Sequence, residues 1–283
     1  MTASSPYAGQ RMALLTQHGK EQVIAPVLAP ALGCTVERID GFDTDTLGTF
    51  TRDIPRTGSQ LDAARRKARI GMELSGLHIG LGSEGAFGND PMTGLFPWNV
   101  ECLVLVDDIR GIEVVGLAQG ATGAGHQTAS DWPTAEAFAR RVGFPAQHLV
   151  VRPDHDAHPQ LRKGLAGWTA LREAFDWALD QSTQGRVFIE TDLRAHCNPA
   201  RMQMIERAAQ DLLQRLQSHC PACDSPGFAL IERVPGLPCG VCHTPTQECQ
   251  GEVWGCVKCQ HRRMERRTTP PYADPGRCPS CNP

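Results

Sequence analysis

The chain has 283 residues, of which 41% are hydrophobic and 21% charged, and its formal net charge is −3. This length predicts one large domain with a buried core plus a small module, and the near-neutral charge gives no global nucleic-acid signature. No run approaches the roughly 18 apolar residues of a membrane span, and the opening residues lack the pattern of a signal peptide, so we expect a soluble, cytoplasmic protein.

The first part of the chain, residues 1–218, alternates strand and helix patterns, which predicts an α/β or α+β domain with a mixed sheet. The sequence DDIRG between two apolar runs predicts a hairpin, and the glycine-containing segments 83–91 and 120–130 are expected to be loops. We expect strands near 12–16, 34–39, 77–81, 100–106, 112–117, 148–151 and 186–190. We expect helices ending at Leu32 and covering 59–74, 133–142, 168–181 and 199–217.

The final segment, residues 219–283, contains four Cys-x-x-Cys pairs. Two thiolates separated by two residues reach one metal ion from a tight turn, and two such turns complete a tetrahedral site. Four pairs therefore predict a module of two zinc ribbons with two structural Zn²⁺ ions, neither of which keeps an open position for substrate. The predicted ligands are Cys220, Cys223, Cys239, Cys242, Cys256, Cys259, Cys278 and Cys281.

The sequence leaves two ways to divide these pairs between two ions. Sequential pairing leaves 15 residues between Cys223 and Cys239 and 18 between Cys259 and Cys278, which are natural ribbon lengths. Interleaved pairing leaves 32 and 35 residues, which a cross-braced module accommodates. We favour sequential pairing and keep the interleaved arrangement as the alternative.

The tail contains one cluster of basic residues, formed by Arg262, Arg263, Arg266 and Arg267. We interpret this cluster as the solvated face of a strand that follows a zinc-binding turn. The alternative is a contact with nucleic acid or with a protein partner, because clustered arginines attract phosphates and carboxylates.

Polar residues follow three predicted strands of the large domain. Lys20 stands in a turn before a helix, where backbone N–H groups and a cation form a phosphate cradle, and Glu84 beside Gly85 is a candidate to hold Mg²⁺ or to orient water. The third place follows the strand RVFIE and contributes Asp192 and His196 as candidate catalytic residues. The structural alternatives are an ordinary turn, a polar loop and a charged network.

Further cations complete the candidate substrate site. Arg52 and Arg56 are candidates to clamp a phosphate group, and Lys67 and Arg194 add positive charge. Together with Lys20, these residues predict a phosphorylated small molecule as the substrate.

The segments GKEQVIAPVLAPALG, GFDTDTLGTFTR, ETDLRAHCNPAR and CPSCNP resemble an uncharacterised bacterial family, known as a domain of unknown function with a cysteine-rich tail. The resemblance covers nearly the whole chain and implies no activity.

The turn with Lys20, the sequence Ala64-Arg65-Arg66-Lys67-Ala68 and Ser83-Glu84-Gly85 are similar to motifs of pyrophosphatases that act on inosine or xanthosine triphosphates. The resemblance covers roughly residues 12–118. It implies that Lys20 binds phosphate and that Glu84 holds a metal ion or water, with Arg194 and His196 near the base.

Two functions therefore compete. The first is a Mg²⁺-dependent phosphohydrolase of nucleotides or related phosphorylated compounds, with the zinc tail as a scaffold. The second is a binding protein without catalysis, whose zinc tail contacts nucleic acid or another protein.

Overall fold

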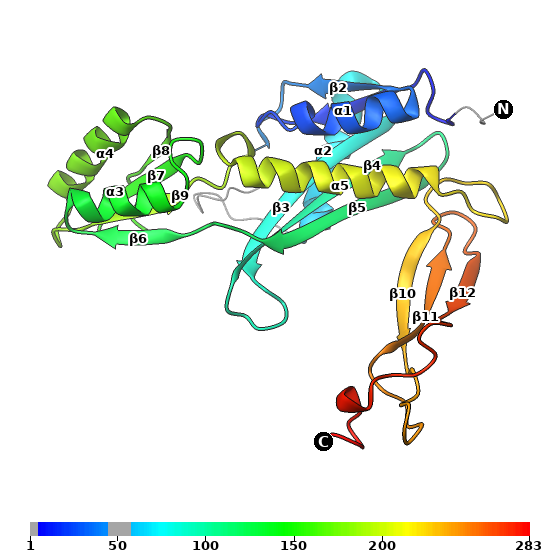
Figure 1. Cartoon of the computed structure of the whole chain (residues 1–283). Helices are drawn as coiled ribbons and strands as arrows, with labels where there is room; N and C mark the ends of the chain where they lie inside the picture. Colours follow the sequence, from blue (N-terminus) through cyan, green and yellow to red (C-terminus); the bar gives the residue numbers. More distant parts are fainter. Residues whose placement is uncertain (1–4, 45–57) are drawn as a thin grey trace. The chain divides into compact units, whose positions relative to one another are not determined.

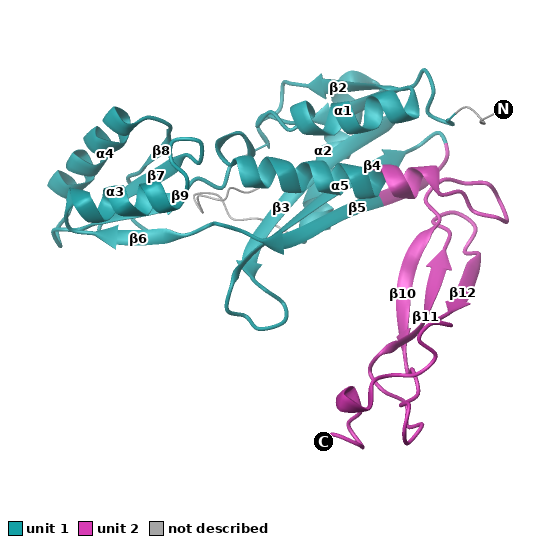
Figure 2. Cartoon of the chain, in the orientation of Figure 1, with its two compact units in different colours: residues 1–109, 115–212 teal, residues 110–114, 213–283 magenta. Residues whose placement is uncertain are grey.

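The computed structural model describes residues 5–44 and 58–283. The chain divides into two compact units, which Figure 2 shows in different colours: unit 1 comprises residues 1–109 and 115–212, and unit 2 comprises residues 110–114 and 213–283. Unit 1 mixes helices and strands, whereas unit 2 is built mainly from strands and contains both four-cysteine groups. The predicted mixed α+β fold with a cysteine-rich tail is therefore confirmed. That residues 1–218 and 219–283 fold as separate domains remains a prediction.

Unit 1 is organised around a five-stranded mixed sheet with the strand order β2-β1-β3-β4-β5. β1 pairs in parallel with both β2 and β3, whereas β3 and β4 form a long antiparallel pair. A tight turn joins β4 to β5, as the hairpin signal predicts. The strands are β1 (Arg11–Leu15), β2 (Thr35–Ile39), β3 (Ile79–Asn89), β4 (Pro97–Asp107) and β5 (Ile112–Ala121).

Glycines determine how closely two helices approach this sheet. A Cβ atom on Gly82 of β3 would lie 1.9 Å from the carbonyl oxygen of Ala64 in α2 (Gln60–Ser75). A Cβ atom on Gly85 would instead meet the side chain of Arg201 in α5 (Pro199–Gln217), at 2.5 Å. Since side chains alternate between the faces of a strand, α2 and α5 cover opposite faces of β3.

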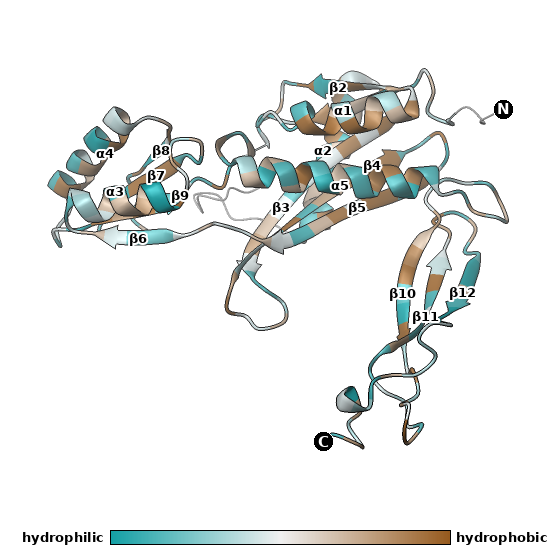
Figure 3. Ribbon diagram, viewed as in Figure 1, coloured by the Kyte–Doolittle hydropathy of each residue, from teal (hydrophilic) through white to brown (hydrophobic). Residues whose placement is uncertain are grey.

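The first helix, α1 (Glu21–Leu32), lies on the same face as α5 (Figure 1). On β1, Ala13 and Leu15 lie next to Gly71 of α2, so Met12 points to the other face. There the sulfur of Met12 lies 3.9 Å from the thiol of Cys34, which follows α1. The apolar colouring of β4 in Figure 3 matches its burial, since all its residues from Glu101 to Asp107 are buried.

Unit 1 also contains a four-stranded antiparallel sheet with the order β6-β9-β7-β8. Two helices pack on it through small and aromatic side chains such as Phe138 and Phe175, which are almost fully buried. The elements are β6 (His126–Ala129), α3 (Trp132–Arg141), β7 (Leu149–Pro153), β8 (Arg162–Leu165), α4 (Trp168–Gln181) and β9 (Val187–Thr191).

Unit 2 is a three-stranded antiparallel sheet with the order β10-β11-β12 and long turns at both of its ends. The Cys-x-x-Cys pairs lie in these turns and in the segments that enter and leave the sheet. β12 is hydrophilic along its length in Figure 3. The strands are β10 (Ala229–Pro235), β11 (Cys249–Gly255) and β12 (Arg262–Arg266).

Two loop predictions are wrong. Residues 83–89 continue β3, because Gly82 and Gly85 give neighbouring groups room to approach the strand rather than turning the chain. In the segment 120–130, β5 extends to Ala121 and β6 pairs with β9. The short strand β8 was not predicted.

Candidate functional sites

The eight predicted zinc ligands form two groups of four thiols at distant places in unit 2. In each group the sulfur atoms all lie within 4.8 Å of one another. Four sulfurs at about 2.3 Å from one zinc ion form a tetrahedron with edges of about 3.8 Å. The closest distances between pairs are 3.7 Å for Cys220 to Cys259 and 3.6 Å for Cys242 to Cys278, so each group fits one tetrahedral ion.

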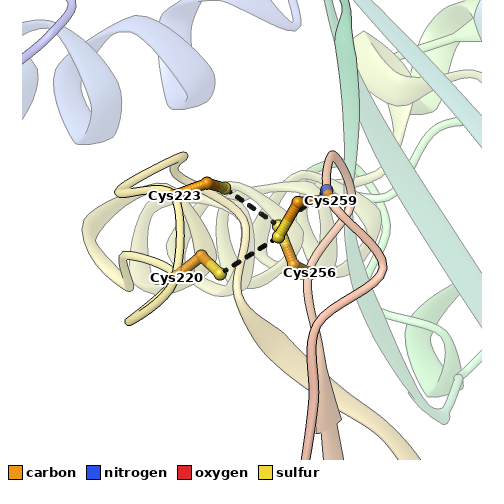
Figure 4. Close-up of side chains that lie close together, drawn as sticks. All are labelled: Cys220, Cys223, Cys256 and Cys259. Atoms are coloured by element: carbon orange, nitrogen blue, oxygen red, sulfur yellow. Dashed lines mark hydrogen bonds between the residues drawn. The ribbon is translucent and has the colours of Figure 1, made fainter.

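The pairs are interleaved, so our preference for sequential pairing was wrong. One group contains Cys220, Cys223, Cys256 and Cys259 (Figure 4), and the other contains Cys239, Cys242, Cys278 and Cys281. The strands explain the division. β10 carries the chain from the first pair to the second, β11 brings it back to the third, and β12 leads it away again to the fourth, so alternate pairs meet at the same end.

Backbone hydrogen bonds prepare the thiols for a metal ion. The amide of Lys258 donates to the sulfur of Cys256, and the amide of Val241 donates to that of Cys239. Hydrogen bonds with the hydroxyl and amide of Thr244 lower the pKa of Cys242, whereas the hydrogen bond with Cys242 raises the pKa of Cys281 in the same group. Because metals bind thiolates, the contacts that lower a thiol pKa favour the ligand form. The two groups are geometrically suited to bind two metal ions, and four thiolates favour zinc.

A second cluster of functional side chains lies in unit 1, where β1 ends beside the continuing strand β3. β1 stops at Leu15, while β3 runs on to Asn89. The side chain of Lys20 lies beside the uncovered part of β3, where its Nζ donates to the carbonyl oxygen of Ser83 at 2.9 Å and contacts the Ser83 hydroxyl at 3.2 Å. These two contacts hold the buried side chain of Lys20 beside β3, between the two faces of the sheet.

Two buried ion pairs flank Lys20 on the two faces of the sheet. On the α2 face, the Nζ of Lys67 lies 2.6 Å from a carboxylate oxygen of Glu84. On the α5 face, the Nε of Arg201 lies 2.7 Å from a carboxylate oxygen of Glu101, and both side chains are almost fully buried. Arg201 also donates to the carbonyl oxygen of Leu193. Three cations and two carboxylates therefore meet around one end of the sheet.

Burial and neighbouring cations lower the pKa of Lys20 to about 7. Burial is the main cause, Arg201 and Lys67 act in the same direction, and Glu84 and Glu101 oppose it. Near neutral pH, the Lys20 amine is thus divided between its charged and uncharged forms. A negatively charged ligand would favour the charged form.

Two histidines extend the cluster. The rings of His18 and His196 stack with centroids 5.0 Å apart, although these residues come from opposite ends of unit 1. Burial, followed by the charges of Lys20 and His196, lowers the pKa of His18 to about 3, so His18 is neutral at physiological pH. His196 stands in a 3₁₀ turn (Ala195–Cys197) directly before α5.

The other candidates after β9 belong to a structural pair. Asp192 accepts hydrogen bonds from the side chain of Arg194, at 2.6 Å, and from the backbone of Gly164 in β8. Burial alone would raise the pKa of Asp192, but these hydrogen bonds outweigh it and hold the pKa below its ordinary value. Asp192 therefore fastens the end of β9 to β8.

The structure thus brings together four of the predicted site residues: Lys20, Lys67, Glu84 and His196. Arg52 and Arg56 lie outside the described residues. Sequence reasoning did not single out Glu101, and it included Arg201 only as a member of the charged segment 190–201. The sequence did contain a signal for Glu101: it is a charged residue inside the apolar run of β4, and a buried charge requires a partner.

Two buried cysteines outside the two groups, Cys102 and Cys197, are not suited to act as nucleophiles. Burial is the main cause that raises the pKa of Cys102 to about 11, and burial likewise raises that of Cys197 to about 12. Both thiols stay protonated at neutral pH, and a protonated thiol is a poor nucleophile. Cys102 is 2% exposed and packs in an apolar cluster as a small hydrophobic residue.

The comparison with protein families identifies the relatives of this chain. The model of the family described as a domain of unknown function (DUF6671) matches residues 67–283, which include both four-cysteine groups. The chain therefore belongs to this family. No curated protein and no solved structure matches the chain. Within the described residues, no helix has the length and apolar character that crossing a bilayer requires.

Proposed function

We propose that unit 1 is a phosphohydrolase that acts on a nucleotide or a related phosphorylated small molecule. The observation that carries this proposal is the convergence of three cations from three separate elements: Lys20 and Arg201, which are buried, and Lys67, which is partly buried. Among the described residues, the carboxylates of Glu84 and Glu101 oppose these charges. A site with excess positive charge and little water suits phosphate groups, because electrostatic attraction is stronger away from bulk solvent.

The pKa of Lys20 supports an anionic ligand. A lysine with a pKa of about 7 gains a full charge when a phosphate group binds beside it, so binding is accompanied by proton uptake near neutral pH. Phosphoryl transfer depends mainly on positioning and charge stabilisation, which these fixed cations supply. In this proposal Lys20, Lys67 and Arg201 bind phosphate oxygens, and Glu84 orients the attacking water.

Mg²⁺ is proposed as a cofactor that arrives with the substrate. Among the described residues, the only groups of three or more convergent metal ligands are the two cysteine groups, so this part of the chain offers no complete protein cage for Mg²⁺. Mg²⁺ commonly binds one or two carboxylates together with substrate phosphates, and Glu84 is the carboxylate suited to this role. The bound ion would neutralise phosphate charge.

The similarity to inosine and xanthosine triphosphate pyrophosphatases suggests which compounds to test first. That resemblance implies that Lys20 binds phosphate and that Arg194 and His196 contact the base. The stacking of His196 on His18 supports a place for His196 beside the phosphate site. Arg194 and Asp192 would then support the turn that carries His196.

The test is a panel of nucleoside triphosphates, including inosine and xanthosine triphosphate, incubated with the full chain and Mg²⁺. We expect release of pyrophosphate or phosphate, with a loss of at least about 100-fold in kcat for Glu84→Gln. The matched control is Glu136→Gln, which removes an exposed carboxylate paired with Arg140 on α3. Turnover that is absent, or equal in both variants, contradicts the proposal.

A second candidate function is binding of nucleic acid or protein by unit 2. Its supporting observation is that all five residues of β12 are exposed, including Arg262 and Arg266. In the described part of the chain no carboxylate forms an ion pair with either, whereas Arg263 pairs with Glu265. Heparin and DNA binding that weakens steeply with salt in the wild type, but is lost in the Arg262→Ala/Arg266→Ala double variant, would support it.

A further inference from the structure

A cavity of about 240 Å³ lies in unit 1 between segments that are far apart in the sequence. Its walls are formed by residues 122–124, by residues 142–143 and 146–147 after α3, and by residues 198–200 at the start of α5. The catalytic proposal above makes no use of this cavity.

The lining of the cavity selects an uncharged ligand. Among the described residues that line it there is no lysine, arginine, aspartate, glutamate or histidine, and most of them are glycine, alanine, valine and proline. Two carboxamides supply polarity. The Nε2 atom of Gln147 donates to the carbonyl oxygens of Asp192 and Cys197, so its orientation is fixed. Within the described residues no hydrogen bond engages its Oε1 atom, which is thus an acceptor for an N–H group of a ligand.

The cavity adjoins the polar cluster. Asn198 lines the cavity, and its side-chain oxygen accepts a hydrogen bond from the backbone amide of Arg201, whose guanidinium group binds Glu101. The turn with His196 directly precedes Asn198. The short segment 196–201 thus contributes to the wall of the uncharged cavity and also supplies His196 and Arg201 to the cationic cluster.

We propose that this cavity binds the neutral, flat heteroaromatic ring of the substrate, with an N–H edge that faces Gln147, while the phosphates lie at Lys20, Lys67 and Arg201. The proposal rests on the proposed function, since it assigns the second half of the same substrate. A volume of about 240 Å³ accommodates one ring system and excludes large side groups. A nucleobase has this combination of a neutral ring, N–H donors and attached phosphates.

The decisive variant is Ala146→Trp, which fills the mouth of the cavity from an exposed position in a turn. Ala157→Trp is the matched control, since Ala157 is also exposed in a turn of unit 1 and does not line the cavity. Thermal unfolding of both variants checks that they fold. Two substrates are compared: inosine triphosphate, which has a ring, and inorganic tripolyphosphate, which has none.

For Ala146→Trp we expect KM for inosine triphosphate to rise at least about tenfold, with KM for tripolyphosphate unchanged. Ala157→Trp should change neither value. An equal effect of Ala146→Trp on both substrates, or no effect on the nucleotide, overturns the assignment of the cavity.

Binding of inosine, which lacks phosphate, separates this inference from the proposed function. If the wild type hydrolyses neither substrate, the phosphohydrolase proposal fails, and isothermal titration with inosine still tests the cavity. Binding to the wild type that weakens at least about tenfold in Ala146→Trp supports the cavity as a ring site. Equal binding to both proteins, or no binding to the wild type, overturns it.

Discussion

The two candidate sites of this chain are assembled in different ways. In unit 2, each short Cys-x-x-Cys motif delivers two ligands, and two motifs complete one closed site. In unit 1, Lys20, Lys67, Glu84 and Arg201 come singly from different elements, and the sheet determines where they meet. A local sequence motif therefore predicts a metal site before the fold is known, whereas a site made of single residues can be recognised only once the fold is known.

The sharpest test of this difference concerns how the cysteine pairs share metal ions, and it carries the largest expected effect. The double variant Cys223→Ser/Cys256→Ser alters one group and should retain one zinc ion per chain, whereas Cys223→Ser/Cys239→Ser alters both groups and should retain none. Metal content measured by mass spectrometry after dialysis distinguishes the two. Sequential pairing would give the opposite result for these variants.

Loss of both ions should also unfold unit 2, because structural zinc contributes on the order of 10 kcal/mol to the folding of small modules. Amide hydrogen exchange should then show loss of protection for β10, β11 and β12. Cys249→Ser is the control, since Cys249 belongs to neither group. Protected amides in these strands after removal of zinc would contradict a structural role for the metal.

The next largest effect concerns the buried ion pair in unit 1. Arg201→Met leaves the Glu101 carboxylate buried without its main partner and should lower the free energy of unfolding by about 3–5 kcal/mol. The double variant Glu101→Gln/Arg201→Met should recover part of this loss, because neither partner is left as an unpaired buried charge. Arg172→Met breaks an exposed pair with Asp176 and should change stability by about 0.5 kcal/mol or less in urea unfolding.

A smaller effect concerns the close contact between α2 and β3. Gly82→Ala places a methyl group against the backbone of Ala64 and should destabilise unit 1 by about 1–3 kcal/mol. Gly88→Ala, on the same strand, has nothing within 4 Å of the added atom and should be nearly neutral. Equal urea midpoints for these two variants would contradict the packing of α2 on β3.

The last test concerns the pH dependence that Lys20 introduces. The pKa of Lys20 is about 7 in the folded chain, whereas its ordinary value of 10.5 applies to the unfolded chain, so between these values the unfolded chain holds more protons. Stability relative to Lys20→Met should therefore rise with pH across this window. Lys163→Met, which removes an exposed lysine of β8, is the control for loss of a lysine side chain. A flat profile for Lys20→Met would contradict the lowered pKa.

Much of the fold could be predicted from the sequence, because it depends on local patterns. The helix 199–217 has the predicted bounds, since its apolar stripe and its start at Asn198-Pro199 are local signals. The extension of β3 could not be predicted in this way. Its glycines are typical of a turn. They are instead required because α2 and Arg201 approach the strand closely, and these contacts involve residues distant in the sequence.

The candidate sites show the same limit. All eight cysteines of the two groups were predicted, but their division was not, since ribbon length alone does not show that each strand carries the chain to the opposite end. In unit 1, Lys20 and Glu84 were predicted from their positions after strands. Arg201 and Glu101 form a pair 100 residues apart, and only the packing of α5 on β4 brings them together.

The interleaved cysteine groups have a consequence for the register of the three strands that they enclose. An antiparallel sheet usually keeps its register because apolar side chains must stay on one face, yet β11 contains two glycines and β12 is fully exposed. A slip of one residue would move a cysteine pair by about 3.3 Å relative to its partner pair and destroy the tetrahedron. Bound metal ions at both ends would therefore fix the alignment of these strands, which leaves the side chains of β12 free to vary for other roles.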